Sequence, residues 1–447
     1  MTVAVIGAGV AGAAAARTLR RNGVEPLVFE ASDSVGGRTR TVAGDECDID
    51  SGAIFLMGSY DATFRFLRES GHDTELRRWE ARAAVMDEDG KTYPVRFDRP
   101  WTFLRLPHLR WRDRLRLART IGALSVRSGP APFDTDGLAT ADDGRTLAEW
   151  ARATVGDRAY EYVVRPLMGP LTGADPEKIS AAFTIALMSQ VHRTRLSVPR
   201  GGLGRIASWL LDGIDVRVST PVRSLEHRSS GVRVGTADES FDVDGVVVAT
   251  DVRQARALLD GVVDDDVCAA LDAVAPIPAY HVLLGYDTDP WPAVGHDLVV
   301  QAGPGRHHNY GVLLNSRRAP YAVPRGGQTV SVYFDRDQAP ESDEEQVVAR
   351  ARGAVDRAFG VATPDFHRVF GMDVALIAPT PWHYESMRRA RDAMPDTIRL
   401  AGDYLSHSGI EAALDSGERA ARDVLASSVS PRSVIARDRP AGGRSAS

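Results

Sequence analysis

The stretch Val3-Ala4-Val5-Ile6-Gly7-Ala8-Gly9-Val10-Ala11-Gly12 decides the fold of this chain. Its apolar start predicts a short buried strand, and the alanine-rich segment that follows predicts a helix. The glycines between them stand in the G-x-G-x-x-G pattern of a dinucleotide-binding turn. Gly7 would permit the tight turn, Gly9 would let the backbone approach a pyrophosphate, and Gly12 would let the helix pack closely on the strand. The helix N-terminus would then direct its N–H groups at the phosphates.

A carboxylate and a guanidinium follow this turn. A second predicted strand, residues 25–29, ends at Glu30, whose carboxylate can accept hydrogen bonds from ribose hydroxyls. Gly36-Gly37-Arg38 then offers bare backbone and a guanidinium to a diphosphate. This combination moves the interpretation of the cofactor from NAD to FAD. A further predicted strand, 48–54, ends in small residues that include Gly52-Ala53, against which a flat ring could lie.

A second group of motifs stands near the C-terminus. Residues 398–401 predict a buried strand that delivers Gly402-Asp403 to the carboxyl edge of a sheet, where parallel sheets bind ligands. After a short loop, Gly409 begins a predicted helix that runs to about residue 426. Segments 216–225 and 244–250 predict further strands between the two groups of motifs.

Together these motifs resemble the flavin-dependent amine oxidase superfamily, which includes monoamine and polyamine oxidases, protoporphyrinogen oxidase and the phytoene desaturases. The resemblance implies an α/β fold in which a discontinuous Rossmann-like FAD-binding domain is interrupted by an α+β substrate domain with a mixed sheet and helices. The implied FAD-binding domain comprises residues 1–57, 196–261 and 384–428. The implied substrate domain comprises residues 58–195 and 262–383, and residues 429–447 are expected to form a disordered tail.

The resemblance also implies which residues hold the cofactor. Val222 matches the superfamily residue that contacts the adenine, and Asp403 matches the one that binds the ribitol or pyrophosphate. The dipole of the helix that begins at Gly409 would stabilise the negative charge of reduced flavin. No cysteine lies near this C-terminal motif, so we expect FAD to be bound non-covalently. The expected contacts are Gly7, Gly9, Val10, Ala11, Gly12, Glu30, Ala31, Gly36, Gly37, Arg38, Gly52, Ala53, Ile54, Val222, Ala249, Thr250, Gly402, Asp403, Gly409, Ile410 and Ala413.

Three residues are candidates for chemistry beside the flavin. Classical amine oxidases carry a lysine ten residues before the Trp of a Pro/Trp turn, and that count from Trp291 lands on His281. The imidazole could hold a water or accept a proton, because it titrates near neutral pH. Alternatively, it is a hydrogen-bonded strand histidine with no role in the chemistry. Trp382 and Tyr384 could wall the substrate against the flavin ring, or they could pack in the core.

Three classes of function remain open at this point. The first is oxidation of a small-molecule amine: a hydride passes from a substrate C–H bond to flavin N5, an imine forms, and O2 reoxidises the flavin with release of peroxide. The second is dehydrogenation of a cyclic or apolar substrate, favoured by the missing lysine and by a segment around Asp175-Pro176-Glu177-Lys178 that resembles protoporphyrinogen oxidases. The third is a non-catalytic binder on the same fold, which the intact glycine turn, Glu30 and Arg38 disfavour.

Composition excludes several other classes of protein. The 447 residues carry a net charge of −6, which gives no polyanion-binding footprint, so we expect no nucleic-acid partner. Cys47 and Cys268 are far apart and lack metal-ligand spacing, which fits a reducing cytoplasm. We expect no metal site, and the adjacent His307-His308 predicts a polar loop or a pocket rim. No stretch approaches the ~20 apolar residues that a membrane span needs.

Segment 99–127 is basic, aromatic and leucine-rich. It could lie on a membrane surface and feed an apolar substrate to the site. Pro100 and Pro107 interrupt its first half, and Asp113 dilutes its positive charge. We therefore favour a substrate-domain helix with solvated arginines and core leucines.

Overall fold

The computed structural model describes residues 1–447 except 194, 229–230, 305–310, 337–342 and 430–447. The predicted tail, apart from its first residue Val429, therefore lies outside the described residues, as does the His307-His308 pair. No helix in the described part of the chain is both long enough and apolar enough to cross a bilayer.

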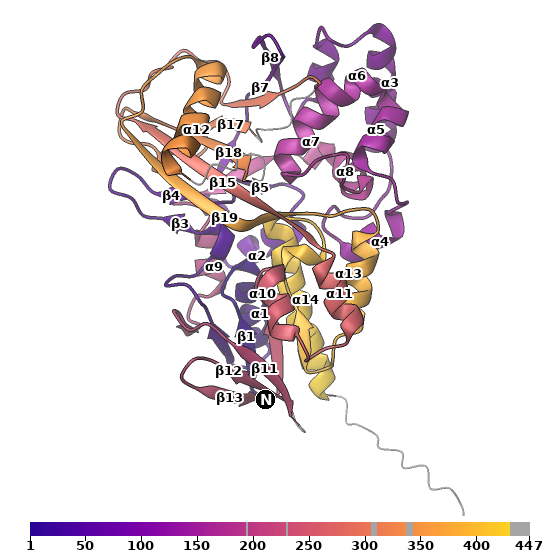
Figure 1. The fold of residues 1–447 in the computed structure, drawn as a ribbon, viewed down its shortest axis with the longest axis vertical. Helices are drawn as coiled ribbons and strands as arrows, with labels where there is room; N and C mark the ends of the chain where they lie inside the picture. Colours follow the sequence, from indigo (N-terminus) through magenta and orange to yellow (C-terminus); the bar gives the residue numbers. More distant parts are fainter. Residues whose placement is uncertain (194, 229–230, 305–310, 337–342, 430–447) are drawn as a thin grey trace, which may run out of the picture.

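A five-stranded parallel sheet forms the lower half of the molecule in Figure 1. Its strand order is β10-β2-β1-β14-β20, and the segments that form it are far apart in the sequence. The strands are β1 (Val3–Ile6), β2 (Pro26–Phe29), β10 (Val216–Arg217), β14 (Gly245–Val248) and β20 (Ile398–Leu400). This parallel sheet confirms the predicted Rossmann-like part of the fold.

Both faces of the parallel sheet are covered. On one face α1 (Val10–Arg21) packs against the C-terminal helix α14 (Ile410–Val429), and a Cβ at Gly417 would lie only 2.0 Å from the Ala11 carbonyl oxygen. Alternate strand residues such as Ala4 and Ile6 pack on the other face. That face is covered by β11 (Ser224–Arg228), β12 (Gly231–Gly235), β13 (Ser240–Val243), α10 (Val252–Leu259), α11 (Asp265–Asp272) and α13 (His383–Asp392).

A seven-stranded mixed sheet lies above the parallel one (Figure 1). Its order is β19-β15-β18-β17-β16-β7-β8, and its neighbours are antiparallel except β16 and β7. The strands are β7 (Ala83–Met86), β8 (Thr92–Val95), β15 (Ala275–Tyr286), β16 (Leu298–Gln301), β17 (Gly311–Leu314), β18 (Gln328–Asp335) and β19 (Phe366–Ala378). Helix α12 (Glu344–Phe359) packs on one face, which confirms the predicted mixed sheet with helices.

Helices gather beside this sheet at the upper right of Figure 1. They are α3 (Trp111–Ser125), α5 (Leu147–Val155), α6 (Asp157–Ala159), α7 (Arg165–Thr172) and α8 (Ala181–Ser189). The remaining elements are short: β3 (Thr41–Val42), β4 (Ile49–Asp50), β5 (Leu56–Met57), α2 (Asp61–Glu69), β6 (Leu76–Trp79), η3 (Pro100–Arg105), α4 (Thr135–Ala141), β9 (Leu196–Pro199) and α9 (Arg205–Leu210). The division of the chain into two domains stays a prediction.

Two predicted strands are shorter than expected. The strand expected over 48–54 ends at Asp50, because the chain bends at Gly52, where a Cβ would lie 2.5 Å from the Arg38 carbonyl oxygen. The strand expected over 216–225 is split between β10 and β11. Ser219 takes a φ of +50° there, and Pro221 has no N–H to donate to a neighbouring strand.

Candidate active site

One large cavity lies between the two sheets and the helices. Its volume is about 1020 Å³, at the upper end of the roughly 300–1,000 Å³ typical of small-molecule sites, so one drug-sized ligand would not fill it. The carboxyl ends of β1, β2 and β14 open into it, which is the ligand-binding edge of a parallel sheet. Every predicted cofactor contact lines this cavity except Gly12.

The glycine turn explains why Gly12 is the exception. Gly7 has a φ of +101°, which favours glycine, and a Cβ at Gly12 would lie 1.8 Å from the Gly7 carbonyl oxygen. Gly12 therefore permits close packing of helix on strand, as the motif predicts. By contrast, a Cβ at Gly9 would have no protein atom within 4 Å. The open space beside Gly9 is what a ligand needs to approach the backbone.

Glu30 lines the same part of the cavity and is only 8% exposed. Its Oε2 accepts a hydrogen bond from the Ala8 N–H at 2.7 Å, and its Oε1 accepts one from the Ser32 N–H at 2.9 Å. An ionised carboxylate offers about four acceptor sites, so two remain for ribose hydroxyls. Val222 and Ala31 line the cavity beside it, as expected for the adenosine end.

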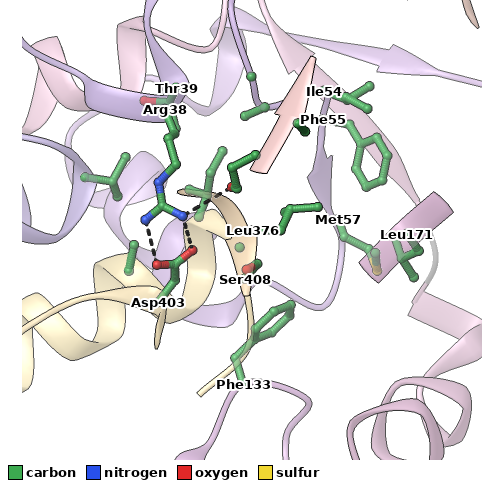
Figure 2. Close-up of a pocket in the computed structure, with 18 of the residues that line it drawn as sticks. Arg38, Thr39, Ile54, Phe55, Met57, Phe133, Leu171, Leu376, Asp403 and Ser408 are labelled. Carbon is green, nitrogen blue, oxygen red and sulfur yellow. Dashed lines mark hydrogen bonds and ion pairs between the residues drawn. The ribbon is translucent and has the colours of Figure 1, made fainter. Parts of the chain in front are cut away.

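Arg38 and Asp403 face each other across the middle of the cavity wall (Figure 2). Nη1 of Arg38 donates to one carboxylate oxygen at 2.9 Å and Nη2 donates to the other at 2.7 Å. Burial opposes the charge on Arg38, but the Asp403 carboxylate outweighs it and raises the pKa of the guanidinium. The sequence predicted that both residues bind the cofactor, and did not predict that they pair with each other.

The first turn of α14 meets the cavity at Gly409, Ile410 and Ala413. The first N–H groups of a helix have no partner within it, and the helix dipole makes this end partly positive. Glu411, also in this turn, points elsewhere: its carboxylate accepts from the Ala62 N–H at 2.6 Å and from the Thr63 N–H at 2.9 Å. It thereby caps α2 and ties this helix to α14, a role that the sequence reasoning missed.

The part of the cavity beyond Arg38 and Asp403, on the side of the helices, forms a chamber lined mainly by apolar side chains. In Figure 2, Met57, Leu171 and Leu376 lie across the pocket from the charged pair. The helical wall of this chamber, contributed by η3, α3, α5, the segment 160–164, α7 and α8, bears no charged side chain among the described residues. Its lining residues are Pro100, Phe103, Leu117, Thr120, Ile121, Leu124, Trp150, Val155, Val163, Val164, Leu167, Met168, Pro170, Leu171, Phe183, Thr184, Leu187 and Met188.

Comparison with known proteins assigns the family. Residues 10–425 match the family model described as flavin containing amine oxidoreductase. The chain belongs to this family. It is 28% identical over 364 residues to AofH of Mycobacterium tuberculosis, named as a flavin-containing monoamine oxidase, covering 76% of this chain and 71% of that protein.

Solved structures share the fold of this amine oxidoreductase over nearly its whole length. A protoporphyrinogen oxidase-like protein from Exiguobacterium has a TM-score of 0.78 at 16% identity, covering 95% of this chain and 98% of that one. Cyclohexylamine oxidase from Brevibacterium oxydans has a TM-score of 0.75 at 20% identity, with the same coverage. At these identities the likeness establishes the fold alone.

The protein is thus an FAD-dependent oxidoreductase, and its cavity fits the cofactor. The open backbone at Gly9, the free acceptor sites of Glu30 and the first turn of α14 suit a pyrophosphate, a ribose and the flavin ring, respectively. Neither Cys47 nor Cys268 lines the cavity, so neither is placed to tether the flavin.

The structure corrects the expected position of His281. The side chain is 1% exposed and does not line the cavity. Its Nδ1 lies 3.0 Å from the Ser51 carbonyl oxygen, which can only accept, so Nδ1 carries the proton; Nε2 then accepts from the Ser331 hydroxyl at 2.9 Å. Burial lowers the pKa of the imidazole to about 4. Both ring nitrogens are occupied, so His281 positions the strand ahead of Gly52.

The expected positions of Trp382 and Tyr384 are corrected as well. Neither residue lines the cavity. Trp382 has a φ of +70° ahead of α13, and its backbone N–H donates to the Asp142 carboxylate. The residue is 57% exposed. Tyr384, two residues later, is fully buried in the apolar core. Two other residues wall the cavity from this side, Leu376 on β19 and Ile410 on α14.

Sequence reasoning also missed two features of this wall. Tyr333, the cross-strand partner of His281, lines the cavity, and its ring stacks on the imidazole with a centroid distance of 4.4 Å. Burial raises the pKa of its hydroxyl to about 12, so it stays protonated at neutral pH. Behind it, Nη1 of Arg318 donates a hydrogen bond to the carboxylate of the buried Asp50. The same Nη1 also donates to the Ile54 carbonyl oxygen at 2.8 Å. Strand alternation could have indicated Tyr333, but no local motif marks the Asp50–Arg318 pair.

Proposed function

We propose that this protein oxidises a small amine with one nitrogen and a hydrocarbon body, and that O2 is the electron acceptor. The observation that carries the proposal is the uncharged helical wall of the chamber. A second ammonium group buried there would have no counter-charge, at a cost of about 3 kcal/mol, or roughly 100-fold in binding. A monoamine with an apolar body avoids this cost.

Bound FAD supplies the redox chemistry, accepting the hydride removed from the carbon next to the substrate nitrogen. The chain's own residues have other tasks. The apolar side chains of the chamber, such as Leu171 and Leu376, hold the hydrocarbon body and exclude water. The partly positive first turn of α14 favours the negative charge that reduction creates. No residue is assigned as a proton acceptor, because His281 is buried away from the cavity.

A matched pair of substrates tests the proposal. Hexylamine and 1,6-diaminohexane share a chain length and differ by one ammonium group. We expect hexylamine to bleach the flavin absorbance anaerobically, and to release peroxide in air, with kcat/KM about 100-fold above the diamine. Equal or better use of the diamine would contradict the proposal. A Leu171→Glu variant should raise use of the diamine, and Leu171→Gln is its uncharged control.

The second candidate is dehydrogenation of an apolar cyclic or polyene substrate to a C=C bond. The same uncharged wall supports it, together with the histidine in place of the family's lysine. An acidic tetrapyrrole fits less well, because no cationic side chain of the helical wall would meet its carboxylates. Bleaching by a polyene but by no amine would establish this function instead.

A further inference from the structure

Exposed apolar side chains gather in the consecutive elements η3 and α3. Eight large apolar side chains of the described residues are at least 40% exposed, and four of them belong to this segment. Trp111 is 69% exposed and Trp101 is 56% exposed. The other two are Leu115 and Val126. A segment of 26 residues, 101–126, thus holds four of the eight large apolar side chains that are exposed in the described part of the chain.

The same segment carries arginines without counter-charges. Residues 99–127 contain eight arginines and a single acid, Asp113, in a chain whose net charge is −6. None of the eight arginines forms an ion pair with another described residue, although arginines elsewhere in the protein pair extensively. The nearby acids are engaged: Asp98 pairs with Arg96, and Asp113 accepts the Arg110 N–H. All eight arginines are exposed: Arg99, Arg105, Arg110, Arg112, Arg114, Arg116, Arg119 and Arg127.

The two kinds of side chain share one face of α3. Trp111, Leu115 and Ala118 follow helical spacing and are all exposed, and Arg112, Arg116 and Arg119 run beside them. The opposite face of α3 packs on α5 and α8 and contributes Leu117 and Leu124 to the cavity. Figure 1 shows α3 at the upper right edge of the molecule, with its outer side turned away from the other helices. The expected core leucines and exposed arginines are therefore both present, and the outer face also exposes Trp111 and Leu115.

We propose that this face, made by Trp101, Trp111, Leu115 and the neighbouring arginines, binds the surface of an anionic lipid bilayer. Tryptophan favours the headgroup region, where its ring is buried and its N–H stays hydrated. Exposed arginines that form no ion pair within the protein can contact anionic headgroups. A nucleic acid would match the arginines but not the exposed Trp and Leu side chains on a convex helix. Docked in this way, the inner side of α3 would bring the apolar chamber close to the lipid phase.

Vesicle flotation with the FAD-loaded full chain tests this proposal. Vesicles of phosphatidylcholine with one third phosphatidylglycerol are compared with pure phosphatidylcholine vesicles, at low and at high salt. We expect the partition coefficient on the anionic vesicles to be at least tenfold higher at low salt, and to fall as salt rises. Two variants of this face are compared with the wild type. One combines Trp101→Ala and Trp111→Ala, and the other combines Arg112→Glu, Arg116→Glu and Arg119→Glu. Each should lower the partition coefficient on anionic vesicles at least tenfold.

Matched controls remove the same groups elsewhere. The variant Arg325→Glu with Arg352→Glu and Arg357→Glu changes the net charge equally, and Val361→Ala removes an 86% exposed apolar side chain. Both should float like the wild type, and retained flavin absorbance verifies that each variant is folded. Failure of the wild type to float with anionic vesicles at low salt would overturn the proposal. So would binding that survives both Trp substitutions and is matched by heparin, because that result indicates a polyanion site.

Discussion

Arg38 and Asp403 lie 365 residues apart in the chain and form a bidentate ion pair on the cavity wall. One partner follows the second strand of the parallel sheet and the other follows its last strand. The pair therefore joins the first and last segments of the cofactor site. It also places a guanidinium and a carboxylate where the sequence predicts that a diphosphate and a ribitol chain bind.

The pair should be energetically coupled. We expect Arg38→Gln and Asp403→Asn each to lower the free energy of unfolding of cofactor-free protein, because the first leaves the buried Asp403 unmatched and the second leaves the half-buried Arg38 unmatched. The double variant should lower the free energy of unfolding by about 1–2 kcal/mol less than the sum of the decreases in the two single variants. Urea unfolding of the four proteins measures this coupling, and strictly additive effects would show that the pair contributes nothing.

Gly9 and Gly12 should respond oppositely to alanine. Gly9 has a φ of −69° and open space around a Cβ, so Gly9→Ala should leave the cofactor-free protein within about 1 kcal/mol of the wild type. The added methyl group would occupy the ligand side of the turn, and we expect FAD affinity to fall roughly 100-fold. Gly12→Ala would instead clash with Gly7 and destabilise the fold by about 1–3 kcal/mol or more. Fluorescence titration with FAD, and urea unfolding, separate the two effects.

Stability should fall in mild acid. Burial lowers the pKa values of His281, His383 and His407 to about 4, below their ordinary value of 6.5. Between these pH values the unfolded chain binds more protons, so the free energy of unfolding rises with pH. Their stabilisation is complete above about pH 6.5 and is lost as the pH falls towards 4, with a slope of up to about 1.4 kcal/mol per pH unit for each histidine.

Urea unfolding between pH 4.5 and 7.5 measures this slope. Carboxylates with lowered pKa values, such as Asp98 beside Arg96, add acid sensitivity only near and below their ordinary value of 3.8. A free energy of unfolding that stays constant from pH 5 to 6.5 would contradict the prediction. The same burial predicts that His281 contributes no step to the pH dependence of kcat/KM near neutrality.

Glu411 should matter more to stability than an exposed carboxylate elsewhere in the chain. Glu411→Gln keeps the shape but replaces one acceptor oxygen by a donor facing the N–H groups of Ala62 and Thr63. We expect it to lower the free energy of unfolding by about 1–2 kcal/mol, in the range of a lost helix cap. Glu25→Gln, at a side chain that is 69% exposed, is the control and should be neutral.

The sequence predicts the cofactor half of this molecule well because its signals are local. The turn at Gly7–Gly12, the carboxylate of Glu30 and the first residues of α14 each lie in a short segment that a local sequence pattern marks. The substrate half depends on packing between distant segments. His281 matched a count along the chain, yet its side chain packs behind Ser51, 230 residues away. Trp382 followed a family pattern, but the left-handed backbone ahead of α13 turns it outward.

The close packing of α1 on α14 also orders events during synthesis. β20 and the helix that packs on α1 leave the ribosome almost 400 residues after the glycine turn. Until then α1 lacks α14, one of the elements that cover its apolar side, and the part of the cofactor's wall contributed by Asp403 and the first turn of α14 is absent. A nascent or truncated chain would consequently expose apolar surface that chaperones and proteases recognise. A chain that ends before α14 should therefore bind FAD less tightly than the full chain.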